Sequence, residues 1–274
     1  MKKLLYSFRN LKDQNFIINV CKTILSLQIY EKPNDDSFCA IMVEGRLRKL
    51  DTLEDLTSIW SFKTFSKFNY PVFVFCNTNI DCLGGDWTWI KENRIELIQI
   101  EPLNSLEEYT KFCIEKLYYL IPTHIDNIIT IQPDGMLLKE GFEDWIINNE
   151  FDLIGSHWSH KTSLTSNGYH FPYPMVQGCN LGFSFRKAAK MREISNIFKE
   201  MKNLRQFGDT NCPEDVFYSY LGYGSKICKL PTLKECDVWA KDPLTIDIWN
   251  DKKNLPFGFH CFRAYPEFPV CNHN

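Results

Sequence analysis

The sequence predicts an α/β protein with a mainly parallel central sheet flanked by helices. Short apolar runs rich in Val, Ile and Phe alternate along the chain with longer segments of helical periodicity. Each apolar run is bounded by polar or turn residues, as buried parallel strands are. The chain has 274 residues, which suits one large α/β unit. Strands that alternate with helices in this way pair in parallel and carry helices on both faces of the sheet.

The chain opens with a predicted amphipathic helix over residues 14–30, whose apolar residues recur at helical spacing. A turn-rich break follows at residues 31–36. We therefore expect an N-terminal helical extension over residues 1–36, packed on a main domain that comprises residues 37–274.

Within the main domain, the predicted strands are residues 38–43, 72–76, 96–100, 125–131, 151–154 and 178–185. The predicted helices are residues 52–68, 105–120, 141–149, 187–204 and 212–221. From Gly222 onward, the many Pro and aromatic residues predict only short strands and loops.

Composition excludes some classes of protein. The formal net charge of −3 provides no basic surface for nucleic acid. The eleven cysteines are an odd number without tight pairing, which favours reduced thiols and a cytoplasmic protein. Charged residues interrupt the apolar N-terminus before it reaches the length of a secretory signal, and no stretch is long enough to span a membrane. The sequence is compatible with peripheral contact between the protein and a membrane.

Polar residues that follow predicted strands are the first candidates for a ligand site, because open α/β sheets bind ligands beyond the carboxyl ends of their strands. Glu44 and Arg46 follow the first strand, Gln132 and Asp134 the fourth, and Trp158 the fifth. Asp134 precedes a glycine, so it is either a ligand for a divalent cation or part of a Pro-Asp-Gly turn.

A second candidate region lies around the acidic pair Glu214 and Asp215. Asn211 can cap the helix that follows, with Glu214 three residues later in the capping-box position. This leaves Asp215 to face a pocket, where it could deprotonate a hydroxyl group. Alternatively, both acids only complement the helix dipole.

Two glycine-containing segments complete the candidates. Asn180 and Gly182 lie near the start of a predicted strand, where small residues allow a ligand or another backbone to approach closely. His260 follows a glycine in an aromatic segment; a lone histidine is more often structural than a ligand.

Taken in order, these segments resemble the DUF5672 family, a group expected to be GT-A glycosyltransferases. The resemblance covers about residues 38–262 and rests on the order and spacing of several runs. These are Val43-Glu44-Gly45-Arg46, Gln132-Pro133-Asp134-Gly135, Phe151-Asp152-Leu153-Ile154-Gly155-Ser156-His157-Trp158, Gly178-Cys179-Asn180-Leu181-Gly182-Phe183-Ser184-Phe185-Arg186, Glu214-Asp215-Val216-Phe217 and Pro256-Phe257-Gly258-Phe259-His260. The chain departs from the family pattern at His157, where Pro is usual, and at Cys179-Asn180-Leu181 in the glycine-rich turn.

The resemblance implies a GT-A-like fold with a Rossmann-like nucleotide-binding half and an acceptor-binding half. It implies a hexosyl- or pentosyltransferase of polysaccharide biosynthesis, which moves a sugar from a UDP- or GDP-sugar to a hydroxyl group of a glycan or glycoconjugate with inversion. Asp134 and His260 would bind Mn²⁺ or Mg²⁺, and Asp215, with Glu214 as second choice, would be the base. Residues near the nucleotide would be Glu44, Arg46, Gln132, Asp134, Trp158, Asn180 and Gly182.

Two other functions stay open from the sequence. A nucleotidyltransferase that acts on sugars also needs a carboxylate-bound metal, but it usually has a basic phosphate-binding loop that this chain lacks. A non-catalytic carbohydrate-binding domain could keep the same fold.

Overall fold

The structure is a computed structural model of the whole chain. It describes residues 11–26, 37–44, 61–65, 70–77, 95–157, 162–163, 175–176, 179–203, 213–219, 221–222 and 226–262. The predicted helix over residues 52–68 lies mostly outside this part, although residues 61–65 are helical.

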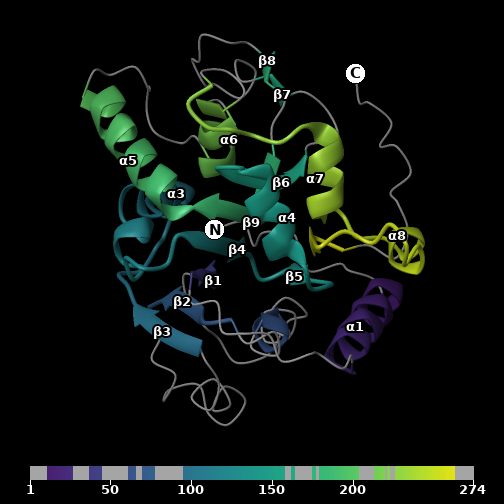
Figure 1. Cartoon of the computed structure of the whole chain (residues 1–274). Helices are drawn as coiled ribbons and strands as arrows, with labels where there is room; N and C mark the ends of the chain where they lie inside the picture. The colour runs from purple at the N-terminus through teal and green to yellow at the C-terminus, as the bar shows by residue number, and fades with distance from the viewer. Residues whose placement is uncertain are drawn as a thin grey trace, which may run out of the picture.

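A six-stranded sheet forms the centre of the fold (Figure 1). The strand order is β3 (Ile95–Gln99), β2 (Val72–Cys76), β1 (Phe38–Val43), β4 (Asn127–Ile131), β9 (Cys179–Lys187) and β6 (Leu153–His157). Neighbours from β3 through β4 are parallel, whereas β9 is antiparallel to both β4 and β6. The prediction of an α/β fold with a mainly parallel sheet is therefore confirmed.

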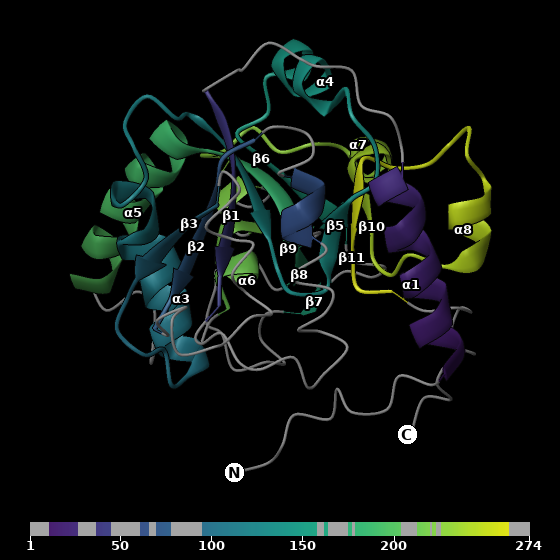
Figure 2. The same cartoon turned by 90° about the horizontal axis from the view of Figure 1, so that it is seen from below.

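Helices cover both faces of this sheet, as Figure 2 shows. One side carries α3 (Leu106–Glu115), the short 3₁₀-helix η3 (Leu117–Tyr119) and α5 (Ala188–Asn203), and α6 (Glu214–Ser219) packs on β9. The other side carries α4 (Phe142–Asn149) and α7 (Leu233–Trp239). Alternate residues of a strand face opposite sides. Thus Phe183 of β9 packs on Trp239 of α7, while Arg186 faces α3 and α6.

A smaller sheet lies beside the central one and consists of β10 (Ala240–Lys241), β11 (Gly258–His260) and β5 (Gly135–Leu137). β5 follows β4 directly and pairs antiparallel with β11, which brings the C-terminal part of the chain to the end of β4. A separate two-stranded sheet joins β7 (Thr162–Ser163) and β8 (Met175–Val176).

Two apolar clusters stabilise these layers. The larger surrounds the central sheet, and the smaller lies between α1 (Leu11–Ser26), the small sheet and α8 (Ile246–Asn250). Helix α1 buries Phe16, Ile17, Val20 and Ile24 of the apolar face predicted for it, and it begins before residue 14, where the predicted helix starts. None of the described helices has the length and apolar character needed to cross a membrane.

The prediction of only short strands and loops after Gly222 is wrong, because α7 and α8 lie there. Thr232 caps α7, with its hydroxyl accepting from Glu235 N and its own N–H donating to the Glu235 carboxylate. Thr245 caps α8 by accepting from Ile248 N. These helices are 7 and 5 residues long, too short for helical periodicity to be recognised in the sequence.

Candidate active site

The carboxyl ends of the parallel strands meet at one edge of the central sheet. Glu44 directly follows β1, and its backbone N–H donates to Phe75 O at the end of β2 (3.0 Å). Gln132 directly follows β4, the neighbour of β1. Because β9 runs in the opposite direction, its first residues reach this same edge, and Gln132 N donates to Gly182 O (2.7 Å).

Three ionisable side chains come together where β4 meets the small sheet. His260 Nε2 lies 3.3 Å from Asp134 Oδ1, and His260 Nδ1 lies 3.2 Å from Asp242 Oδ2. The side chains of His260 and Asp134 are only 13% and 15% exposed. Burial lowers the pKa of His260, but the hydrogen bonds and negative charges of the two aspartates outweigh it and raise the pKa to about 10. The imidazole is thus held from both sides by carboxylates.

Asp134 sits in a tight turn as well as facing His260. Gly135 N donates to Gln132 O (2.8 Å), and Cys261 N donates to Asp134 O (3.0 Å). The two interpretations open from the sequence are therefore compatible. The turn fixes the backbone at the end of β4 and directs the carboxylate of Asp134 to the histidine.

Gly182 determines where the imidazole can lie. A Cβ atom at this position would be 2.0 Å from His260 Cδ2 and 2.4 Å from Nε2, so only glycine leaves room for the ring. The Asn180 side chain supports this stretch of β9, because its Oδ1 accepts from Gly182 N (2.8 Å). The sequence predicts the close approach of a ligand or another backbone at this segment; in the structure, the group that approaches Gly182 is the side chain of His260.

A buried polar network surrounds the first acid of the Glu214–Asp215 pair. Arg186 is 1% exposed and donates to Tyr118 Oη (2.7 Å) and to Ser184 Oγ (3.1 Å). Its Nη2 lies 4.0 Å from Glu214 Oε1, and its guanidinium group lies over the ring of Tyr218. Glu214 is therefore the carboxylate that faces a buried, permanently charged guanidinium group.

The predicted helix cap is wrong, because α6 begins at Glu214 and its first helical hydrogen bond runs from Phe217 N to Pro213 O (3.1 Å). Glu214 is thus the first residue of the helix and not the third residue after a cap. Asn211 lies outside the described residues. The burial of Glu214 is explained by Arg186 instead.

Asp215 is half-buried, and one of its oxygens accepts from Val216 N (2.8 Å). Burial and the negative charge of Glu214 raise the pKa of Asp215 to about 7. A carboxylate that gains and loses a proton near neutral pH has the property expected of a general base.

The structure thus brings Gln132, Asp134, Asn180, Gly182 and His260 together, and it places Glu44 on the same edge of the sheet. Glu214 and Asp215 lie on α6. Arg46 and Trp158 lie outside the described residues. Sequence reasoning missed Asp242 and gave Arg186 no role.

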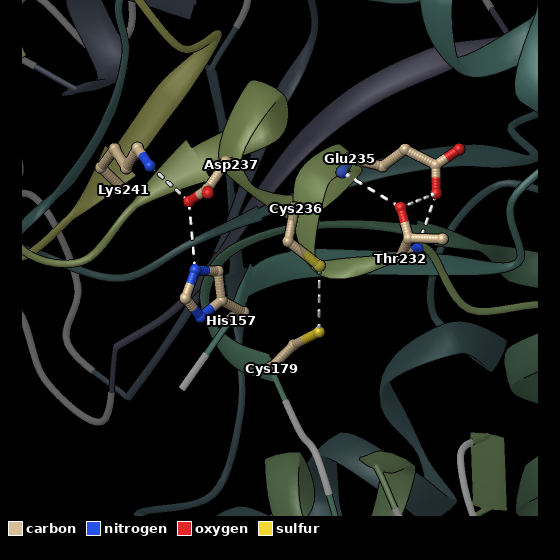
Figure 3. Close-up of polar contacts among 7 residues, drawn as sticks. All are labelled: His157, Cys179, Thr232, Glu235, Cys236, Asp237 and Lys241. Atoms are coloured by element: carbon tan, nitrogen blue, oxygen red, sulfur yellow. Dashed lines mark hydrogen bonds and ion pairs between the residues drawn. The ribbon is translucent and has the colours of Figure 1, made fainter. Parts of the chain in front are cut away.

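A second polar cluster lies at the end of β6, next to the start of β9 (Figure 3). Asp237 Oδ1 contacts His157 Nε2 (3.1 Å) and the ammonium group of Lys241. The residue before Asp237 on α7, Cys236, contacts Cys179 of β9 with 3.7 Å between the sulfur atoms. No disulfide joins the described cysteines.

Asp134 and His260 are the described residues that could supply ligands to a divalent cation, with further ligands coming from elsewhere. In the described ranges, no three or more His, Cys, Asp or Glu side chains form a group that could hold a metal ion. Mg²⁺ and ions like it often bind through one or two protein ligands plus substrate phosphates. A metal-binding histidine typically donates its other ring N–H to a carboxylate, which Asp242 supplies.

Comparisons with known proteins support this description of the fold. The structure of core-mannan synthase A (CmsA/Ktr4) from Aspergillus fumigatus, in its Mn/GDP form, matches with a TM-score of 0.52 and 11% identity over 76% of this chain and 74% of that one. The mannosyltransferase Ktr4p from S. cerevisiae matches with a TM-score of 0.52 and 10% identity over 78% and 76%. The likeness confirms the predicted GT-A-like fold.

The sequence itself is matched by one family description. No curated protein matches the chain. The model of a family described as a protein of unknown function, DUF5672, matches residues 92–260. This match covers more than half of the chain and includes Gln132, Asp134, the start of β9, the acidic pair and His260. The chain therefore belongs to the DUF5672 family.

Proposed function

We propose that the chain is a glycosyltransferase that moves a sugar from a UDP- or GDP-sugar to a hydroxyl group of a glycan or glycoconjugate acceptor. The observation that carries the proposal is the contact between Asp134 and His260 at the carboxyl edge of the sheet. This edge is where open α/β folds bind nucleotides. The GT-A-like fold and the likeness to a structure solved with Mn and GDP support the same function.

Asp134 and His260 would hold Mn²⁺ or Mg²⁺, while Asp242 keeps the imidazole oriented from the far side. When bound, the cation would neutralise charge on the diphosphate leaving group. The remaining candidates near the nucleotide are Glu44, Arg46, Gln132, Trp158, Asn180 and Gly182.

We propose Asp215 as the general base. Its carboxylate would take the proton from the acceptor hydroxyl, whose oxygen forms a bond to the anomeric carbon as the bond from that carbon to the diphosphate breaks. A single displacement of this kind inverts the configuration at the anomeric carbon. Glu214 is less suited to the role, because it is buried and faces Arg186.

We also propose that residues 37–274 form the catalytic unit and that residues 1–36 are an extension attached through α1. The apolar face of α1 packs against the small sheet, which supports this attachment. We expect the protein in the cytoplasm, because eleven cysteines without tight pairing favour reduced thiols.

The test is a screen of nucleotide sugars for hydrolysis and for thermal stabilisation, with and without Mn²⁺. We expect Mn²⁺-dependent release of a nucleoside diphosphate, and Asp134→Ala should abolish Mn²⁺-dependent nucleotide binding in calorimetry without unfolding the protein. Release of pyrophosphate from a nucleoside triphosphate would identify a nucleotidyltransferase instead. Sugar binding without any turnover or metal dependence would identify a non-catalytic domain.

A further inference from the structure

Among the described residues, the cluster at the end of β6 has unused hydrogen-bonding capacity. Asp237 Oδ1 takes both contacts, one with His157 Nε2 and one with Lys241 Nζ (Figure 3). Among the described residues, Asp237 Oδ2 has no hydrogen-bond partner. An ammonium group has three donors, and the described part of the chain uses one of them at Lys241.

The cluster is accessible, unlike the buried network around Arg186. The side chains of Asp237 and Lys241 are 40% and 30% exposed, and that of His157 is 28% exposed. Both contacts fall on Oδ1, which leaves Oδ2 of the same carboxylate beside the ammonium group of Lys241.

The position of the cluster connects it to the proposed active site. Lys241 is followed directly by Asp242, whose carboxylate contacts His260 Nδ1. His157 pairs with Cys179, the residue before Asn180. Along the chain, the cluster is thus one residue away from Asp242, which contacts His260, and its partner strand residue Cys179 is one residue away from Asn180.

The charges of the cluster indicate what kind of group it binds. The carboxylate of Asp237 and the ammonium group of Lys241 neutralise each other, so the pair has little attraction for a phosphate. It offers one acceptor oxygen next to ammonium donors. Two neighbouring hydroxyl groups of a sugar ring match this arrangement, because one can donate to Oδ2 while the other accepts from Nζ.

We infer that Asp237 and Lys241, oriented by His157, form a subsite for adjacent hydroxyl groups of a sugar. The inference rests on the proposed glycosyltransferase function and extends it by naming residues that select the sugar. The sugar belongs either to the donor or to the acceptor, and both offer the same chemistry. Hydrogen bonds to charged groups contribute most to such recognition.

The experiment compares Asp237→Asn and Lys241→Met with the wild-type chain. For each, calorimetry measures affinity for the nucleoside diphosphate alone and for the nucleotide sugar, and kinetics measure KM for the acceptor. If the donor sugar occupies the subsite, affinity for the nucleotide sugar falls about 10- to 100-fold while affinity for the diphosphate stays unchanged. If the acceptor occupies it, only the acceptor KM rises by that factor.

A matched control comes from α3, where Lys111 and Glu107 form another ion pair four residues apart. Their side chains are 35% and 38% exposed, close to the values in the cluster. Lys111→Met and Glu107→Gln should change neither the affinity for the nucleoside diphosphate nor that for the nucleotide sugar. This separates loss of a surface ion pair, which contributes little, from loss of a binding group.

Two results of these measurements would overturn the inference. Unchanged sugar affinity and acceptor KM in both cluster variants would exclude the subsite, and an equal loss of diphosphate affinity would identify a phosphate contact instead. A third measurement, besides calorimetry and kinetics, needs no nucleotide. Ligand-observed NMR with a panel of mono- and oligosaccharides should show binding to the wild-type chain that Asp237→Asn loses. If no nucleotide sugar is a substrate but this loss occurs, the proposed enzyme activity fails while the subsite stands. If neither enzyme activity nor sugar binding is found, both are wrong.

Discussion

Replacing Gly182 with alanine should displace His260 without changing any charge. The added Cβ would lie 2.0 Å from His260 Cδ2, whereas carbon atoms in contact are about 3.5 Å apart. Either the ring or the strand must therefore move by about 1.5 Å. The contacts of His260 with Asp134 and Asp242 are already 3.3 and 3.2 Å long, so a shift of this size breaks at least one of them.

Two measurements follow from this displacement. Overpacking of a well-packed site typically lowers the free energy of unfolding by about 1–3 kcal/mol, which denaturant unfolding detects. Mn²⁺-dependent affinity for a nucleoside diphosphate should fall as far as in His260→Ala, because metal ligands tolerate displacements of only about 0.2 Å. Calorimetry with and without Mn²⁺ measures this effect.

Gly141 provides the control. It has a φ of +85°, and a Cβ atom added there would meet nothing within 4 Å, so alanine strains the backbone without touching a neighbour. Gly141→Ala should reduce stability by about 1 kcal/mol and leave nucleotide affinity unchanged. If Gly182→Ala matched the wild-type chain in stability and in Mn²⁺-dependent affinity, the argument that Gly182 sets the position of His260 would be refuted.

The remaining predictions concern the acidic pair and its arginine. Asp215→Asn should reduce the rate of sugar transfer about 10²- to 10⁴-fold while its affinity for the donor stays near normal. In the wild-type chain, kcat/KM should rise with pH through about 7. A wild-type rate in the variant would exclude Asp215 as the base. The folded-state pKa of Asp215 lies above its unfolded value of about 4, so between these two values the folded protein retains a proton that the unfolded chain has lost. The stability of the wild-type chain relative to Asp215→Asn should therefore fall as the pH rises from about 4 to about 7. Thermal unfolding of both proteins across this pH range checks the direction of the change in stability. A stability difference between the two proteins that stays constant with pH would contradict the prediction. Arg186→Met should destabilise the fold by about 3–5 kcal/mol, because it leaves Glu214 buried without a counter-charge. In denaturant unfolding, the double variant Arg186→Met/Glu214→Gln should show a clearly smaller loss in the free energy of unfolding.

Strands such as β1 and β2 could be predicted because each is a continuous apolar run that ends at polar residues. Runs such as β1 and β2 are buried along their whole length, so their sequences show no competing pattern. Their parallel order also predicts that polar residues after β1 and β4 share one edge, and Glu44 and Gln132 do so.

The contacts within the candidate site could be predicted only in part. Asp134 and His260 are recognisable as candidates because each follows a distinct run, but Asp242 reaches His260 only through the pairing of β10 with β11. Arg186 lies within a run that resembles the family pattern, yet its partner Tyr118 is 68 residues away in sequence, so no local pattern indicates its burial. Contacts of this kind depend on the fold as a whole.

The position of β9 between β4 and β6 has a consequence for the order in which the sheet can assemble during synthesis. β6 leaves the ribosome before β9, but β9 is its only partner among the described strands of the central sheet. β4 can pair with β1 as soon as it is made, since neither strand waits for a later segment. A nascent chain that has not reached Lys187 therefore carries β6 as an apolar strand without its sheet neighbour, the type of segment that aggregates or recruits chaperones.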